Sequence, residues 1–228
     1  MRWALLAVGG LVLAAGCLHP FSVPDRHAEP TTAEPADPLA LAADCLDRGD
    51  DAAAVPHLRE YVRANPRAVQ IRANLAELLH RLGRPADARA EFERLAADDR
   101  PVAREHQIHC HTRLMELASA DGDSYREHLH RGIGLYLLVC RWDADPDRRD
   151  AVATEQTLAK AVAALRAARE DRPTDPRANL YLAAALDRLG QPAAARTARR
   201  AAVAGLPDPS LTPAERAMLD EKHFTFGQ

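Results

Sequence analysis

Aromatic residues are scarce in this chain. Phe, Tyr and Trp make up 4% of its 228 residues, whereas hydrophobic residues of all types make up 47%. Strands draw on aromatic and β-branched side chains, so this composition argues against a β-sandwich. Ala, Leu and Arg dominate instead, and they favour helices that pack closely through small side chains. The hydrophobic content is enough for a real core, in one domain or in a short array of repeats.

An excess of charge of one sign is also missing. The chain carries 30 Lys and Arg against 33 Asp and Glu, for a formal net charge of −3 at pH 7. The two signs are interspersed, so no broad basic face is available to nucleic acid. We therefore expect a solvated surface of mixed charge and no nucleic-acid partner.

Motifs that carry chemistry are absent as well. No stretch resembles a Ser-His-Asp set, a paired-carboxylate pocket, a zinc-protease helix or a nucleotide-binding loop. We therefore expect neither an enzyme nor a bound cofactor.

Long hydrophobic runs are missing too. The apolar run from Ala4 to Ala15 follows a single positive charge, Arg2, and is about half as long as a bilayer-spanning helix. It fits a removable secretory signal better. The run ends in LAAGC at residues 13–17, which resembles the lipobox of bacterial lipoproteins. The resemblance implies cleavage after residue 16 and a lipid on Cys17; a plain signal peptide with an incidental cysteine is the alternative.

The segment after the cysteine bears on location. Leu18 follows Cys17, where lipoproteins retained at the inner membrane would have Asp, so the resemblance implies an outer-membrane lipoprotein that faces the periplasm. Removal of residues 1–16 takes away Arg2, and 29 basic against 33 acidic residues leave a net charge of −4. Residues 17–38 form an extended tether in this interpretation, because a proline-rich polar segment neither forms a helix nor packs. Its prolines are Pro20, Pro24, Pro30, Pro35 and Pro38.

Cysteine is rare, with four residues in the chain. If Cys17 carries lipid, Cys45, Cys110 and Cys140 remain, and an odd set cannot pair completely in an oxidising compartment. We predict buried thiols rather than a disulfide.

The stretch from Val69 to Pro101 has the most regular pattern. Apolar residues recur at helical spacing on both sides of a break at residues 83–85, which predicts two short amphipathic helices around one turn. The apolar positions are Leu75, Leu78, Leu79 and Leu82 before the break, and Ala88, Phe92 and Leu95 after it. One such pair cannot bury enough surface to offset the entropy of ordering, so it needs neighbours.

The pattern recurs at an interval of 34 residues. Gly49 and Gly83 are separated by this interval, as are Ala161 and Ala195 near the other end. The Leu-Ala pairs at residues 75–76 and 182–183, the turn glycines and the small residues of the second helices resemble tetratricopeptide repeats. The resemblance implies an all-α, TPR-like α-solenoid of antiparallel helix pairs over residues 39–209. We expect about five units, with the third and fourth degenerate.

The repeats also depart from the family pattern. No unit has the usual aromatic residue near its start, where Pro38, Arg72 and Asn179 stand. Gly83 and Gly190 are 107 residues apart, which is three periods plus five. If the five residues lengthen the first helix of the third unit, its turn falls on Gly122. The helices of that unit would then cover about residues 102–119 and 124–140.

The rest of the helical pattern is simpler. One long helix is expected over about residues 151–170, in the fourth unit. A short helix should begin at Thr212, because a capping residue is followed by Pro at the first helical position and Glu215 at the third. We expect residues 210–228 to form this capping helix and a tail, with the helix covering the end of the array.

Gly132 and Gly134 lie within the expected second helix of the third unit. Gly lowers helix propensity by about 1 kcal/mol, so two glycines there predict close helix packing. A phosphate-binding loop is excluded because no strand precedes them.

In the repeat family the first helices of successive units line a groove that binds a protein or peptide. The resemblance therefore implies a scaffold or adaptor, anchored to the membrane of the cell envelope. The mixture of Arg, His and apolar residues at the positions below would suit a peptide or helix with acidic and hydrophobic character. The positions carried over to this chain are Gln70, Ala73, Glu77, His80, Arg81, Arg104, Gln107, His111, Leu114, Met115, Arg177, Leu180, Ala184, Asp187 and Arg188.

The third unit offers an alternative function, metal binding. It is rich in zinc-ligating residue types: His106, His109, Cys110, His111, His128 and His130, with Glu105 and Glu127 nearby. Residues two apart on a helix point about 200° apart, so neither His109 with His111 nor His128 with His130 can share a metal. The remaining sets are His106 with His109 or Cys110, and His111 with His128. We favour ordinary surface and half-buried histidines and expect no metal site.

Overall fold

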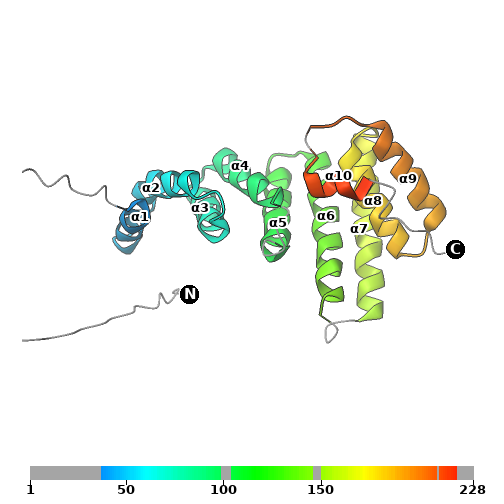
Figure 1. Cartoon of the computed structure of the whole chain (residues 1–228), viewed down its shortest axis with the longest axis horizontal. Coiled ribbons are helices and arrows are strands. Elements are labelled where there is room, and N and C mark those ends of the chain that lie inside the picture. Colours follow the sequence, from blue (N-terminus) through cyan, green and yellow to red (C-terminus); the bar gives the residue numbers. More distant parts are fainter. Residues whose placement is uncertain (1–36, 99–103, 146–149, 210, 220–228) are drawn as a thin grey trace, which may run out of the picture. The chain divides into compact units, whose positions relative to one another are not determined.

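The computed structural model describes residues 37–98, 104–145, 150–209 and 211–219 (Figure 1). These residues all belong to one compact unit, Ala36–Gln228, and the expected signal, Cys17 and most of the tether lie outside them. Every regular element in the described residues is an α-helix. The helices are α1 (Pro38–Asp47), α2 (Asp51–Ala64), α3 (Val69–Arg81), α4 (Pro85–Ala96), α5 (Arg104–Ala120), α6 (Ser124–Asp143), α7 (Ala151–Asp171), α8 (Pro176–Arg188), α9 (Pro192–Ala204) and α10 (Pro213–Leu219).

Four of the helix pairs share one turn. Gly49, Gly83, Gly122 and Gly190 have φ of 75°, 67°, 71° and 70°, a left-handed conformation that side chains with a Cβ rarely adopt. In each turn the residue after the glycine donates to the carbonyl five residues back, as Arg84 does to Leu79 at 3.0 Å. This closes the first helix with a Schellman-type cap. The pairs are α1–α2, α3–α4, α5–α6 and α8–α9.

The spacing of these turns locates the five extra residues. Gly122 lies 39 residues after Gly83, and Gly190 lies 68 residues after Gly122, which is two periods of 34. The insertion therefore precedes Gly122, and α5 has 17 residues where α3 and α8 have 13. The turn expected at Gly122 is present.

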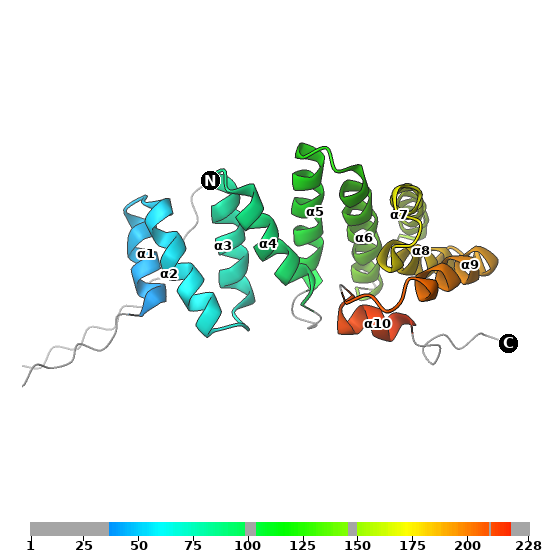
Figure 2. The same ribbon diagram turned by 90° about the horizontal axis from the view of Figure 1, so that it is seen from above.

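A single helix, α7, stands where the fourth unit would have a pair. Gln156, one period after Gly122, lies inside α7 rather than in a turn. Helices α6 and α7 are long, at 20 and 21 residues, and they lie side by side (Figures 1 and 2). Their close approach requires Gly132, because a Cβ there would overlap Leu165 Cγ and come within 3.3 Å of the Ala161 carbonyl oxygen.

The apolar core falls into separate clusters. One extends from α1 to α5 and contains Leu75, Leu79 and Phe92, which are fully buried. A second extends from α6 to α9 and contains Ile133 and Leu165, again fully buried. The division falls between α5 and α6, although these two helices pack against each other.

The C-terminal helix α10 begins with the capping arrangement that the sequence predicts. The Thr212 amide donates to Glu215 Oε2 at 2.8 Å, and the Glu215 amide donates to Thr212 Oγ1 at 3.1 Å. This reciprocal pair satisfies two amides at the start of the helix. Helix α10 packs against α8 and α9, where Leu211 and Leu219 form a small cluster with Leu180.

The cysteines of the described residues are free thiols, and the predicted burial holds for two of the three. Cys45 and Cys110 are buried, and Cys140 is half-buried. Burial raises the pKa of the Cys110 thiol to about 12. None of the described helices combines the length and the hydropathy that crossing a bilayer requires.

Candidate functional site

The first helices of the units present their polar residues on the side away from the core, and α3 shows this most clearly. Gln70 is exposed, and its Nε2 donates to Asn74 Oδ1 at 3.0 Å along the same helix. Arg81 has a side chain that is 63% exposed and pairs with Asp51 of α2 at 2.8 Å. His80 is half-buried. Gln70, His80 and Arg81, three of the four polar positions carried over to α3, are therefore fully or partly accessible to a partner. The bonds of Gln70 and Arg81 described here go to α3 itself and to α2 rather than to another first helix.

Glu77, the fourth polar position, connects α3 to α5. Arg113 Nε donates to Glu77 Oε1 at 2.9 Å, and His109 Nε2 lies 2.7 Å from the same oxygen. Arg113 NH1 also donates to Glu116 at 2.8 Å. Partial burial opposes ionisation of Glu77, but the hydrogen bonds from Arg113 and His109 outweigh it and lower the pKa of this carboxyl. The two first helices thus meet at one charged, half-exposed network.

The positions expected on α5 are placed differently from the prediction. Leu114 is 2% exposed and His111 is 7% exposed, so both belong to the interior. Met115 is half-buried, and the Gln107 side chain donates to the carbonyl of Asp98. Arg104 lies in α5, but its side chain is outside the described residues.

The five inserted residues explain this difference. A shift of five residues turns a helix face by about 140°, so positions copied from α3 at an interval of 34 fall on the wrong side of α5. Counted back from Gly122, the equivalents of Gln70, Ala73, Glu77 and His80 are His109, Thr112, Glu116 and Ser119, and all four are exposed. The signal that could have found them is the interval of 39 residues between Gly83 and Gly122.

His111 meets His130 of α6. Their Nδ1 atoms are 3.0 Å apart, so one ring must donate to the other and at least one must be neutral. Burial lowers the pKa of His130 to about 4, and Arg177 adds to this. Burial and the neighbouring His130 also hold the pKa of His111 well below its usual value. The pair is a neutral polar contact inside the α5–α6 interface, at the division between the two large apolar clusters.

The metal-binding alternative finds no support in this region. Among the described residues, no three His, Cys, Asp or Glu side chains gather closely enough to hold a metal ion. His111 contacts His130 rather than His128, with which one of the candidate metal-ligand sets paired it, and His128 faces Asp171 at 3.7 Å. His109 is engaged by Glu77.

The positions carried over to α8 are largely engaged within the molecule. Arg177 Nε donates to Glu215 of α10 at 2.9 Å, and Leu180 is 2% exposed beneath the same helix. Asp187 pairs with Arg199 of α9. Ala184 is also buried.

Arg188 reaches back to α6. It pairs with Asp143, its NH1 donates to Cys140 Sγ at 3.1 Å, and its guanidinium lies 5.8 Å from the ring centre of Tyr136. Among the positions compared on α3, α5 and α8, the residues with the most accessible polar groups are therefore on α3 and α5. We call these the α3–α5 face and define it as Gln70, Glu77, Arg81, His109, Thr112, Glu116 and Ser119.

Comparisons with known proteins agree with this architecture. The family model for the tetratricopeptide repeat matches residues 46–107, from the last turn of α1 into α5. Together with the helix pairs and their shared turn, the match confirms the expected fold class, a TPR-like α-solenoid. No curated protein shows significant similarity to the chain.

Three solved structures illustrate the similarity. A thermophilic TPR protein of Thermus thermophilus is 17% identical, with 83% of this chain and 81% of that chain covered and a TM-score of 0.40. A structure of MamA is 14% identical, with coverage of 72% and 94% and a TM-score of 0.34. A fragment of MamA from Desulfovibrio magneticus RS-1 is 17% identical, with coverage of 73% and 91% and a TM-score of 0.30.

Proposed function

We propose that this chain, a TPR-like α-solenoid, is a membrane-anchored scaffold or adaptor lipoprotein of the cell envelope that binds a protein or peptide. The observation that carries the proposal is the α3–α5 face, where exposed polar side chains lie on two successive first helices joined by the Glu77 network. We assign the protein a binding role rather than a catalytic one. No observation on the described residues favours metal binding as a second candidate function.

The chemistry of the α3–α5 face suits an amphipathic partner segment. Arg81 and His109 offer cationic or donor groups, and their side chains are 63% and 46% exposed. Glu116, at 45% exposure, offers an acceptor of the opposite sign. A helix or extended peptide with acidic groups facing Arg81 and His109 would complement this arrangement, in the manner of helix-in-groove recognition. Exposed ion pairs contribute about 0.2–1 kcal/mol each, so affinity would come from several contacts together.

The α3–α5 face can be tested by reversing its charge and adding bulk. The double variant Arg81→Glu/Thr112→Glu alters one exposed residue of α3 and one of α5, places carboxylates where acidic groups of the partner should bind, and leaves the bond from Arg113 to Glu77 in place. Crosslinking in membranes followed by purification should recover a partner with the wild type and lose it with this variant. The matched control is Arg196→Glu/Arg200→Glu on α9, where both arginines are exposed. A partner that is recovered equally with all three proteins would refute a role for the face.

The membrane anchor is a separate part of the proposal. It rests on the LAAGC sequence at residues 13–17 and on the proline-rich segment that follows. Cleavage before Cys17 and attachment of lipid would hold the helical unit at the outer membrane on its tether, facing the periplasm. We expect Cys17→Ser to release the protein from the membrane fraction and to remove the mass of the lipid from the mature chain. A variant that stays membrane-bound with unchanged mass would show that the anchor is wrong.

A further inference from the structure

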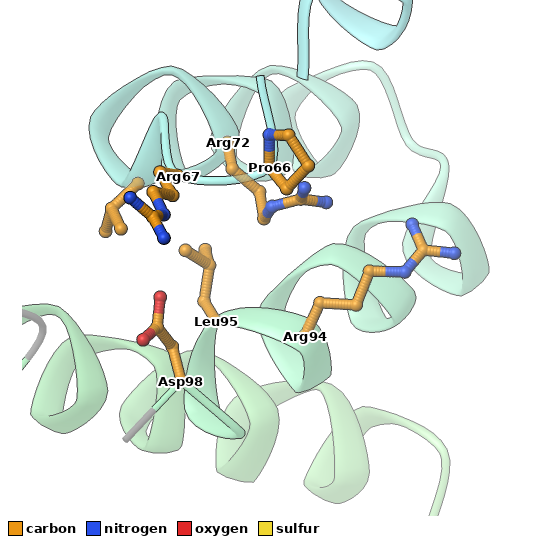
Figure 3. Close-up of a pocket in the computed structure, with 7 residues that line it drawn as sticks. Pro66, Arg67, Arg72, Arg94, Leu95 and Asp98 are labelled. Carbon is orange, nitrogen blue, oxygen red and sulfur yellow. The ribbon is translucent and has the colours of Figure 1, made fainter. Parts of the chain in front are cut away.

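A recess lies between the α2–α3 turn and the C-terminal half of α4 (Figure 3). Its volume is about 400 Å³, and it adjoins a second hollow of about 520 Å³ with which it shares Pro66, Arg72 and Arg94. We call the two together the arginine pocket. It is lined by Arg59, Val62, Arg63, Pro66, Arg67, Val69, Arg72, Asp87, Ala90, Glu91, Arg94, Leu95 and Asp98. None of the residues of the α3–α5 face lines it.

The base of the arginine pocket is apolar. Leu95 is 1% exposed, and Val69 is half-buried against the same core cluster. Figure 3 shows Leu95 between the side chains of Arg67 and Arg94. A ligand that enters here therefore meets aliphatic surface in the middle and guanidinium groups at the sides.

The rim of the pocket carries a surplus of positive charge. Its five arginines face three carboxylates, those of Asp87, Glu91 and Asp98. Two of the arginines, Arg72 and Arg94, share the single carboxylate of Glu91, which is 7% exposed at its side chain. Glu91 is therefore already neutralised within the protein and leaves part of the arginine charge uncompensated.

The arginines differ in how firmly they are held. Arg72 is fixed by Glu91 at 2.8 Å and by the Val62 carbonyl at 3.3 Å, so it belongs to the frame of the pocket. Arg63 and Arg67 are exposed, and neither forms an ion pair with any carboxylate in the part of the chain that the structure describes. They can engage an incoming carboxylate without breaking an existing bond.

We propose that the arginine pocket binds an acidic segment of a partner protein, one aliphatic side chain resting on Val69 above the buried Leu95 and neighbouring carboxylates bonded to Arg63 and Arg67. Arg binds carboxylates through paired N–H donors, and an apolar base flanked by a few polar groups is the usual make-up of a ligand pocket. This site goes beyond the α3–α5 face, since it takes a second segment at different residues.

The surroundings favour a peptide over other anions. Asp87 and Asp98 stand among the arginines and would repel the continuous negative charge of a nucleic acid or an anionic membrane surface. A peptide carries separate carboxylates, which can lie beside the arginines and away from Asp87 and Asp98. A bare inorganic anion has no aliphatic group that could contact the apolar base of the pocket.

Peptide binding to the detergent-solubilised full chain tests this site. The probe is a fluorescein-labelled peptide in which Leu alternates with Glu, and its affinity is measured by fluorescence anisotropy at low and physiological salt. Arg63→Glu/Arg67→Glu should weaken binding by about tenfold, since each exposed ion pair is worth up to about fivefold and the two new carboxylates repel those of the peptide. Affinity for the wild type should also fall as salt is raised. The matched control, Arg196→Glu/Arg200→Glu on α9, should bind the peptide within about twofold of wild type.

Two further peptides separate the contributions of charge and apolar surface. Replacing Glu by Gln in the probe removes the carboxylates, and replacing Leu by Ser removes the aliphatic groups. Both peptides should bind more weakly than the parent. In NMR spectra of the wild type, the parent peptide should shift the methyl signals of Val69 and Leu95.

Several outcomes would overturn the assignment. Equal loss in the α9 control would show non-specific electrostatics, and undiminished binding of the Gln peptide would exclude carboxylate recognition. Tight binding of vesicles containing phosphatidylglycerol, lost in Arg63→Glu/Arg67→Glu, would assign the pocket to a membrane surface instead. Arg81→Glu/Thr112→Glu should leave peptide binding unchanged, so failure of the α3–α5 face and failure of the arginine pocket are distinguishable.

Discussion

The His111–His130 contact makes stability depend on pH at the scale of single residues. Both rings are buried and held neutral in the fold, with the pKa of His130 lowered to about 4 against 6.5 for an unperturbed histidine. In the unfolded chain the two histidines bind protons at a higher pH than they do in the fold. The stability that the neutral histidine pair contributes is therefore full above about pH 6.5 and is lost as the pH falls toward 4. Arg177, Arg126 and Arg89 oppose protonation of His130, and Asp123 favours it.

We therefore expect the free energy of unfolding to fall by about 3 kcal/mol between pH 6.5 and 4 from His130 alone. When urea unfolding is measured at several pH values, the free energy of unfolding should depend less steeply on pH for His130→Asn than for the wild type. His57→Asn, which removes a half-buried histidine of α2, is the control and should keep the wild-type slope. An unchanged slope in His130→Asn would contradict the interpretation, whatever its absolute stability.

Gly132 is the second residue whose identity has a direct physical consequence. A methyl group there would overlap Leu165 Cγ, and Leu165 is fully buried and cannot move aside freely. Overpacking of this kind costs about 1–3 kcal/mol, which exceeds the gain of up to about 1 kcal/mol in helix propensity. Gly132→Ala should therefore lower the midpoint of thermal unfolding.

Gly134→Ala is the matched control for Gly132. A Cβ at Gly134 would meet only the Cβ of His111, at an ordinary contact distance of 3.4 Å. This variant should be neutral or slightly stabilised by its better helix propensity. Destabilisation of both variants to the same extent would indicate a general effect of glycine replacement rather than close packing of α6 on α7.

The close packing at Gly132 was predictable, but its partner was not. Two glycines inside a helical pattern indicate a near approach because their cost in propensity needs a reason. The contact with Leu165 requires α7 to lie beside α6. The two helices are neighbours because the fourth unit has the single helix α7 where a regular unit would have a pair. A residue pattern in α6 carries no information about that neighbour.

At the scale of elements, the ion pair between Glu215 and Arg177 and a small apolar cluster hold α10 to α8. Glu215 serves two purposes, because it caps its own helix and binds Arg177 at 2.9 Å. Its side chain is 8% exposed and that of Arg177 is 25% exposed, so removing the carboxylate leaves a largely buried guanidinium without this partner. Loss of one member of a buried pair costs about 3–5 kcal/mol, and partial exposure of Arg177 reduces this figure.

Glu215→Ala should therefore detach α10. Hydrogen exchange should become faster in α10 and on the covered part of α8 near Leu180, with little change in α1–α4. Thr212→Ala removes only the cap and should cost about 1 kcal/mol, a smaller effect. Unchanged exchange in Glu215→Ala would mean that Leu211 and Leu219 alone hold the helix in place.

Helix α5 was predicted at the right place in the chain, but its exposed side was predicted wrongly. Its existence and its turn at Gly122 follow from local pattern, but the choice between intervals of 34 and 39 residues decides which side is open. His111 and Leu114 were expected on that side and are buried, whereas Thr112 and Glu116 are exposed. Which residues of α5 are buried depends on how α5 packs against its neighbours α4 and α6, and the pattern of residues within α5 does not specify that packing.

At the scale of the whole described chain, the apolar core is interrupted between α5 and α6. Each cluster is built from helices adjacent in sequence, and repeat arrays of this kind derive stability from units and their nearest neighbours. A core mutation should therefore act mainly on its own cluster. Leu79 and Leu165 are both fully buried, one in each cluster.

Leu79→Ala should cost about 2–5 kcal/mol and speed hydrogen exchange chiefly in α1–α5. Leu165→Ala should have the opposite pattern, with faster exchange chiefly in α6–α9. The two variants thus serve as controls for each other. Uniform acceleration across all helices in both variants would show that the two clusters unfold as a single cooperative unit.

The amino-acid sequence by itself determined the helices, the four glycine turns and the Thr212 capping box, because these depend on interactions within about five residues of the chain. It also carried the 34-residue interval that predicts the helix pairs. Tertiary structure decided which residues are open: it buried His111 against His130, placed α10 over Leu180, and brought Arg67 of the α2–α3 turn and Leu95 of α4 to one pocket. These outcomes depend on contacts between segments far apart in sequence, and a five-residue insertion is enough to change them.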